Sequence, residues 1–204
     1  MNTTNKPPNN SDQLFLAIGE FFVSFSNLIS ITEHLTASLI SKDGDERSYK
    51  RARIAVSNLT AQPLANAFFS LLKEFETQNW TTNDKSLVKH ARVELDTLIA
   101  QRNRFAHDIW HLGHPNLPQP SPDAWHRIRT IGTPKHGLVT EFEEITIDQI
   151  SNLIHNIKRI DTNIRQLSLA GIACDDYRPE LHMKFLIDES GTKQVVCILY
   201  DSNG

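Results

Sequence analysis

Arg102, Asn103 and His107 lie within the six-residue segment RNRFAH. A guanidinium group binds phosphate or carboxylate through paired planar donors, and an imidazole changes protonation near neutral pH, which suits proton transfer. Arg102 also falls on an apolar stripe with the three-then-four spacing of a buried helical face: Val88, Ala91, Leu95, Leu98, Phe105 and Ile109. Because an arginine is costly to bury without a polar or anionic partner, this segment is a candidate functional site.

Hydrophobic periodicity predicts four long helices, at about 13–41, 64–76, 84–110 and 147–169. Runs rich in β-branched and aromatic residues flank turns at 133–137 and 189–192 and predict two small β-hairpins, one after the third helix and one after the fourth. Thr146 and Gln149 form a capping-box pattern before the last helix. Short connections favour antiparallel neighbours, so the expected fold is mainly α, an antiparallel up-down helical bundle.

The expected domain organisation has three parts. Residues 1–12 are rich in Asn, Thr and Pro and predict a disordered tail. Residues 13–173 form the helical domain, with the first hairpin inserted at about 124–145, and residues 174–204 form a C-terminal hairpin appendage. A chain of 204 residues is long enough for one domain with a sizeable core.

The net charge of −3 gives the chain no overall attraction to nucleic acid, so any such contact requires a local basic patch. The densest basic cluster is Lys50, Arg51 and Arg53, for which a solvated helix start or a loop is favoured over a nucleic-acid patch. Two cysteines are too few for a disulfide framework, so a cytoplasmic location is expected.

No membrane partner is expected either. The most apolar stretch is the first helix, and Glu20, Glu33 and His34 interrupt it. We therefore expect no run long and apolar enough to span a bilayer.

The arrangement of Arg102 and Asn103, three further residues and then His107 near a helix end resembles the motif of the HEPN superfamily, many of whose members are metal-independent endoribonucleases. The resemblance covers about residues 13–170, and only the six-residue motif is specific. It implies an RNA substrate, no metal or other cofactor, and a homodimer whose composite active site pairs two motifs across a two-fold axis. It also implies a toxin or antiviral defence context, with an antitoxin or a defence-system protein as partner.

Asn103 and His107, four residues apart, share a helical face, whereas Arg102 and His107 are rotated by about 140°. Arg102 must bend round, the helix must distort, or a second copy must complete the site. Metal-free cleavage of RNA needs a proton acceptor for the ribose 2′-hydroxyl and cationic donors for the phosphate. His107 suits the first role and Arg102 the second, and Asn103 would orient His107 or the phosphate by hydrogen bonding. The products are a 2′,3′-cyclic phosphate and a 5′-hydroxyl.

Three alternatives remain open from the sequence. His107 and His111 are four apart and could bind a metal from one helical face. In an inert bundle, His107 would be a satisfied buried histidine, and Arg102 would pair with a core carboxylate: Asp96, Glu94 or Glu33. A catalytically inactive module could keep the motif and bind RNA or a partner protein.

Overall fold

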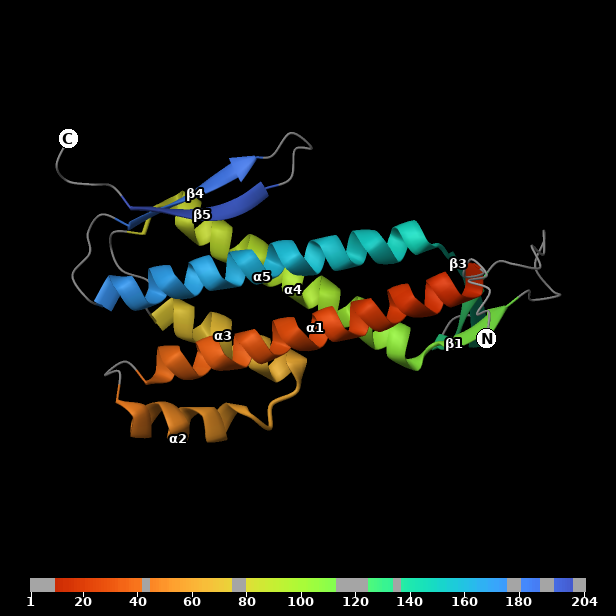
Figure 1. Ribbon diagram of the computed structural model, residues 1–204, viewed down its shortest axis with the longest axis horizontal. Coiled ribbons are helices and arrows are strands. Elements are labelled where there is room, and N and C mark those ends of the chain that lie inside the picture. The colour runs from red at the N-terminus through yellow and green to blue at the C-terminus, as the bar shows by residue number, and fades with distance from the viewer. Residues whose placement is uncertain are drawn as a thin grey trace, which may run out of the picture. The chain divides into compact units, whose positions relative to one another are not determined.

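The structure is a computed structural model that describes residues 10–41, 45–74, 80–112, 125–133, 137–175, 181–187 and 193–199. These residues form five helices and five strands (Figure 1): α1 (Asn10–Ile40), α2 (Glu46–Val56), α3 (Ala61–Glu74), α4 (Thr82–His107), β1 (Ile109–Leu112), β2 (Trp125–Thr133), β3 (Gly137–Ile145), α5 (Ile147–Asp175), β4 (Leu181–Ile187) and β5 (Lys193–Leu199). The described chain is mainly helical with a small three-stranded antiparallel sheet, which confirms the expected mainly-α class.

The chain divides into two compact units. The first unit comprises Met1–Phe25 and Gln101–His155, and the second comprises Ser26–Ala100 and Asn156–Gly204. The division falls inside α1, α4 and α5, each of which contributes residues to both units. The expected boundary between a domain at 13–173 and an appendage at 174–204 stays a prediction.

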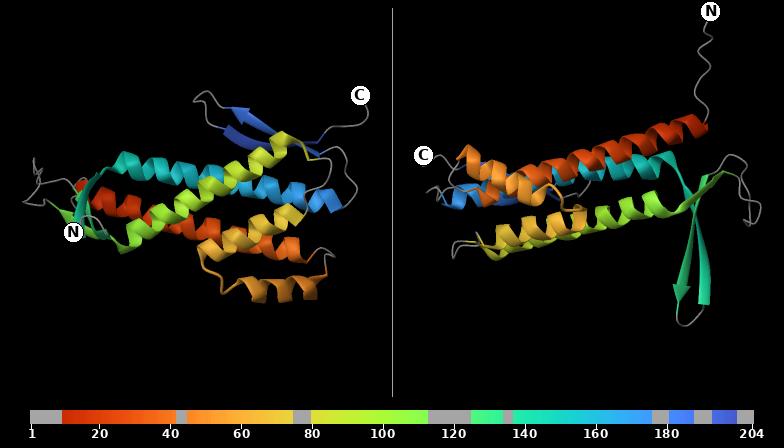
Figure 2. Two further views of the ribbon diagram at one scale, coloured as in Figure 1. Left: turned by 180° about the vertical axis from the view of Figure 1, so that it is seen from behind. Right: turned by 90° about the horizontal axis from the view of Figure 1, so that it is seen from below.

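The first unit contains an antiparallel sheet in the order β1-β2-β3. β2 and β3 occupy the two runs expected to pair around 133–137, and Thr133 pairs with Gly137 across the turn. Gly137 has a φ of 67°, a conformation that glycine adopts without steric cost. Figure 2 (right) shows β2 and β3 as a long two-stranded ribbon. The buried apolar residues of this unit are Leu14, Phe21, Phe25, Phe105, Ile128, Ile145, Ile150 and Ile154.

The second unit buries apolar stripes at helical spacing. α3 lies where a helix at about 64–76 was predicted, and it buries Leu64, Ala65, Phe68, Phe69 and Leu72. Further buried apolar residues include Leu28, Ala37 and Leu39 of α1, Leu87, Ala91, Leu95, Leu98 and Ile99 of α4, and Ile157, Ile160, Ile164 and Leu167 of α5. In the same unit β4 pairs antiparallel with β5, in the two runs expected to form the C-terminal hairpin.

Reciprocal capping fixes two helix starts. The Thr146 N–H donates to Gln149 Oε1 at 2.9 Å and the Gln149 N–H donates to Thr146 Oγ1 at 3.3 Å, which confirms the capping box before α5. At α4, the Asp84 N–H donates to Thr81 Oγ1 at 3.2 Å and the Thr81 N–H donates to Asp84 Oδ2 at 2.7 Å. Each pair satisfies backbone donors that a helix start leaves without an intrahelical partner.

α2 was not among the four long helices expected. Asp45 caps it, because the Ser48 N–H donates to Asp45 Oδ2 at 3.0 Å. The same hydrogen bond lowers the pKa of the Asp45 carboxyl, since it favours the charged form. Other bounds differ as well: α1 begins at Asn10 rather than at residue 13, and α5 continues to Asp175 rather than to about residue 169.

α1 is, within the described part of the chain, the one helix long and apolar enough to cross a membrane. Its segment Ser11–Ile40 contains an 18-residue window with a mean hydropathy of 1.8, so the expectation that charged residues exclude such a segment is wrong on length and composition. Phe21, Leu28 and Leu39 of α1 are almost fully buried within the protein, but only 22% of the apolar window is buried.

Candidate active site at the end of helix α4

The three site residues predicted from the sequence lie in the last two turns of α4. Asn103 and His107 are exposed, and Arg102 is half-buried. α4 ends at His107, and the Asp108 N–H donates to the Arg104 carbonyl at 2.9 Å. His107 is therefore the last helical residue, and no further turn of the helix follows to cover its ring.

The exit from α4 differs from the expectation that the helix runs to Trp110. The chain turns at Asp108 and enters β1 at Ile109. Trp110 Nε1 donates to the Phe105 carbonyl at 3.1 Å, and the two ring centroids are 5.2 Å apart. Because that carbonyl belongs to the last turn and lacks an intrahelical partner, the tryptophan both packs against the helix end and satisfies it.

Arg102 lies over aromatic rings of α1 in the same unit. Its guanidinium carbon is 5.8 Å from the Phe22 ring centroid and 5.9 Å from that of Phe25, a cation–π arrangement. Arg102 Nη1 also donates to Asn103 Oδ1 at 3.3 Å. Within the described chain no carboxylate pairs with Arg102, so the group is positioned while most of its donors are left for a ligand.

His107 is separate from the other two motif residues. Among described residues, none forms a hydrogen bond or ion pair with its ring. The structure thus brings Arg102 and Asn103 into contact, and Asn103 does not orient His107 within one chain. The five-residue spacing on a regular helix accounts for the separation of Arg102 from His107. Asn103 shares a helical face with His107, but its Oδ1 accepts from Arg102.

The inert-bundle alternative required a core carboxylate for Arg102. Each of the three carboxylates considered for it instead contacts another arginine of the second unit: Arg92–Asp96 at 2.9 Å, Arg159–Glu94 at 2.6 Å and Arg53–Glu33 at 3.2 Å. His107, which that alternative buries, is exposed. The ion pair proposed for the alternative is therefore wrong.

A second arginine, missed from the sequence, contacts the end of α4. Arg127 of β2 and Asp108 have side chains only 5% and 7% exposed, with Arg127 Nε 3.3 Å from Asp108 Oδ2. Arg127 Nη2 also donates to Glu143 of β3, and its guanidinium carbon lies 4.9 Å from the Phe105 ring centroid. We call Arg127, Asp108 and Glu143 the hairpin clamp. It attaches the residue that follows His107 to the β2–β3 hairpin.

Arg104, the remaining arginine of the motif segment, contacts the same hairpin. Its Nη2 is 3.8 Å from Glu143 Oε2, with side chains 40% and 46% exposed. Such a long, half-exposed pair contributes little to stability. Glu143 therefore faces two guanidinium groups, and of the three arginines around the motif only Arg102 has no acidic partner among the described residues.

The sequence carried a signal for the hairpin clamp. A hairpin whose turn lies between Thr133 and Gly137 places Arg127 opposite Glu143, as the strand register shows. Side chains of opposite charge at directly paired positions of neighbouring strands interact favourably. The pair could thus have been inferred from the turn alone, whereas the contact with Asp108 depends on the bend after α4.

The metal-site alternative depended on a continuous helix through His111. His111 instead lies in β1, so the helical face shared with His107 does not exist. In the sheet, His111 pairs with His126 and His126 with Glu144. Even so, the described residues hold no group of three or more His, Cys, Asp or Glu side chains that could hold a metal ion.

Comparisons of the chain with protein-family models, with curated proteins and with solved structures found no match.

Proposed function

We propose that this protein is a metal-independent endoribonuclease of a HEPN-like toxin or antiviral defence system, with Arg102, Asn103 and His107 in its active site. One observation carries the proposal. At the end of α4, a guanidinium group with no acidic partner among the described residues lies over two phenylalanine rings, next to an exposed amide and one turn from an exposed imidazole. A phosphate would supply the anion that Arg102 lacks.

In the proposed reaction, His107 accepts the proton of a ribose 2′-hydroxyl, and the 2′-oxygen attacks the adjacent phosphorus. The bond from phosphorus to the 5′-oxygen breaks, and that oxygen takes up a proton from water, which gives a 2′,3′-cyclic phosphate and a 5′-hydroxyl. His107 then releases its proton to the solvent. Arg102 donates to the phosphate oxygens as negative charge develops there, and Asn103 holds Arg102 through their hydrogen bond. The reaction uses the RNA's own 2′-oxygen and requires no cofactor.

The proposal includes a homodimer of up-down helical bundles in the cytoplasm, restrained by an antitoxin or another defence-system protein. Two features support a second copy at the site. Within one chain His107 contacts neither Arg102 nor Asn103, so a composite site would bring the missing group from the partner. α1 also exposes Leu16 and Val23, 70% and 61% accessible, in the unit that contains the motif. Light scattering at micromolar concentration should show a dimer.

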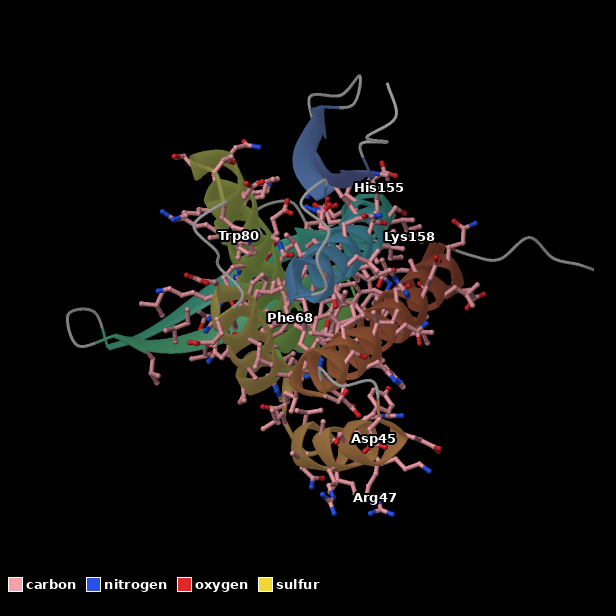
Figure 3. The ribbon with its side chains drawn as sticks, turned by 90° about the vertical axis from the view of Figure 1, so that its left-hand side faces the viewer. Asp45, Arg47, Phe68, Trp80, His155 and Lys158 are labelled. Carbon is pink, nitrogen blue, oxygen red and sulfur yellow. The ribbon has the colours of Figure 1, made fainter. Side chains whose placement is uncertain are left out.

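The test of the activity is incubation of purified protein with total RNA in chelator. Wild type should cut RNA and leave 5′-hydroxyl ends, and His107→Ala should not. The matched control is His155→Ala, which removes an exposed histidine of α5 in the same unit, labelled in Figure 3. His155→Ala should cut as wild type does.

Two results would contradict the nuclease. Cleavage that disappears in chelator and returns with zinc would show metal-dependent chemistry. RNA binding without cleavage, at all pH values from acid to alkaline, would favour the binding-module alternative instead.

A further inference from the structure

α2 has an inner face that packs into the second unit. Ala52 and Val56 are each 4% exposed and belong to a buried cluster with Ala37 of α1 and Leu64 of α3. Tyr49 packs against this cluster from the same side of the helix. Tyr49, Ala52 and Val56 thus attach α2 to the protein, whereas Ile54 is 71% exposed.

Two polar contacts reinforce this attachment to α1. Arg53 Nη2 donates to Glu33 Oε1 at 3.2 Å, and His34 Nδ1 and the Tyr49 hydroxyl share a hydrogen bond of 2.8 Å. Arg53 is therefore directed toward α1. The basic cluster of Lys50, Arg51 and Arg53 seen in the sequence is divided by the fold, and Arg53 does not belong to the outer surface.

The outer face of α2 carries a different basic set. Arg47, Lys50 and Arg51 have the spacing of one helical face and are exposed, and in Figure 3 Arg47 lies on the outer side of the helix. Within the described chain no carboxylate pairs with Arg47 or Arg51. Lys50 contacts Glu46 at 2.6 Å, but these side chains are 69% and 80% exposed, so water and salt screen the pair.

We propose that this outer face, formed by Arg47, Lys50 and Arg51, binds the phosphate backbone of the RNA substrate. The inference rests on the proposed ribonuclease function and gives it a binding surface outside the motif. Exposed cations on a rigidly attached helix complement a polyanion, and the overall charge of −3 makes such a local surface necessary. A membrane surface is a poorer occupant, because an adsorbed helix inserts a broad apolar face, whereas α2 packs Ala52 and Val56 into the protein and exposes one large apolar side chain, Ile54.

The experiment measures RNA binding without cleavage. In a His107→Ala background, Arg47→Gln/Arg51→Gln is compared with Lys158→Gln/Arg165→Gln, which removes two exposed positive charges from α5 of the same unit. Glutamine keeps the helix propensity close to that of the replaced residues. The probe is a labelled single-stranded RNA, with fluorescence anisotropy recorded at several salt concentrations. Circular dichroism melting checks that every variant is folded.

If the α2 face binds phosphates, the α2 variant should bind RNA more weakly. Its plot of log affinity against log salt concentration should also be less steep, with the magnitude of the slope smaller by about 1.4, roughly 0.7 for each lost phosphate contact. The α5 control should keep the wild-type slope. An equal loss in both variants, or no loss in either, would overturn the inference. The same two variants are also tested for binding to vesicles of anionic phospholipid. If the α2 variant loses binding to the vesicles but not to RNA, the inference is overturned, because the surface would then bind membrane.

The outcome is separable from that of the nuclease proposal. If the wild type never cuts RNA but the α2 variant binds RNA more weakly than the control, the α2 surface stands and the nuclease fails. If the wild type cuts RNA and the α2 variant binds it normally, only the α2 surface is wrong.

Discussion

Two arginines around the end of α4 lie over phenylalanine rings, yet their surroundings differ. Arg127 is buried and contacts two carboxylates, Asp108 and Glu143. Arg102 is half-buried, and within the described chain its one polar partner is the neutral amide of Asn103. A buried guanidinium group that already forms ion pairs with two carboxylates has few donors left to bind a ligand. A guanidinium held by aromatic rings retains its charge and most of its donors.

This difference separates a residue that stabilises the fold from one that is available for chemistry. Removing one partner of a buried ion pair leaves an uncompensated charge and strongly destabilises a protein. Removing a cation that lacks an acid should change stability little and ligand binding much.

Replacing Arg102 by Lys should lower RNA cleavage by about 10²- to 10³-fold, the range for losing a donor to developing negative charge. His107→Ala should lower it by about 10²- to 10⁴-fold, the range for losing a catalytic proton-transfer group. Lysine keeps the charge but loses the paired planar donors. The unfolding free energy should change by no more than about 0.5 kcal/mol. Initial cleavage rates and urea unfolding measure the two quantities, with Arg165→Lys as the control. Retained cleavage would remove Arg102 from the site.

Replacing Arg127 by Ala should lower the unfolding free energy by about 3–5 kcal/mol, because Asp108 stays buried without its cation. Urea unfolding measures this change. Arg165→Ala, which breaks an exposed pair with Asp161, should cost no more than about 1 kcal/mol. Equal effects of the two changes would show that the hairpin clamp contributes nothing special. If Arg127→Ala does not fold, Arg127→Lys serves as the milder test.

Replacing Phe22 by Leu should remove one of the two rings beneath Arg102, a contact of about 0.5–1 kcal/mol. The guanidinium would then be less well positioned, so KM for RNA should rise by a few fold. Phe15→Leu is the matched control, since the Phe15 ring packs against Trp125, with ring centroids 5.0 Å apart, and not against Arg102. A KM increase of the same size in both variants would argue against a specific role for Phe22.

Replacing Arg104 by Gln should change the unfolding free energy by at most about 1 kcal/mol, because its pair with Glu143 is long and half-exposed. Thermal or urea unfolding gives the value. A loss as large as that of Arg127→Ala would mean that Arg104 is an essential part of the clamp.

The smallest effect concerns Asp45, an exposed carboxylate held by a backbone N–H. Its pKa is lowered in the folded protein, so its contribution to stability is present above the ordinary aspartate pKa and disappears as the pH falls through the folded value. The difference in unfolding free energy between wild type and Asp45→Asn should therefore shrink in acid. A difference that is constant from neutral pH to pH 3 would contradict this cause.

Local signals made much of the fold predictable. The stripe of α3, the β2–β3 turn and the Thr146–Gln149 capping box each depend on neighbours along the chain. The motif residues were also recognisable from their types and spacing. Their assigned roles stay predictions.

Contacts between distant segments were not predictable. The stripe through Phe105 and Ile109 suggested a helix to Trp110, but β1 pairing with β2 competes for these residues and ends α4 at His107. The rings beneath Arg102 come from α1, far from it in sequence. α2 is short and charged, and its buried residues pack against α1 and α3, a contact that the sequence of α2 alone does not indicate.

The end of α4 is joined to the sheet through the Trp110 hydrogen bond and the Arg127–Asp108 pair. Helix ends normally fray, and their amides exchange rapidly with solvent. Here the amides of the last turn should instead exchange together with those of β2, as one cooperative unit, because opening the turn requires the buried pair to separate. The exposed ring of His107 would then sit on one of the slowest-opening parts of its unit.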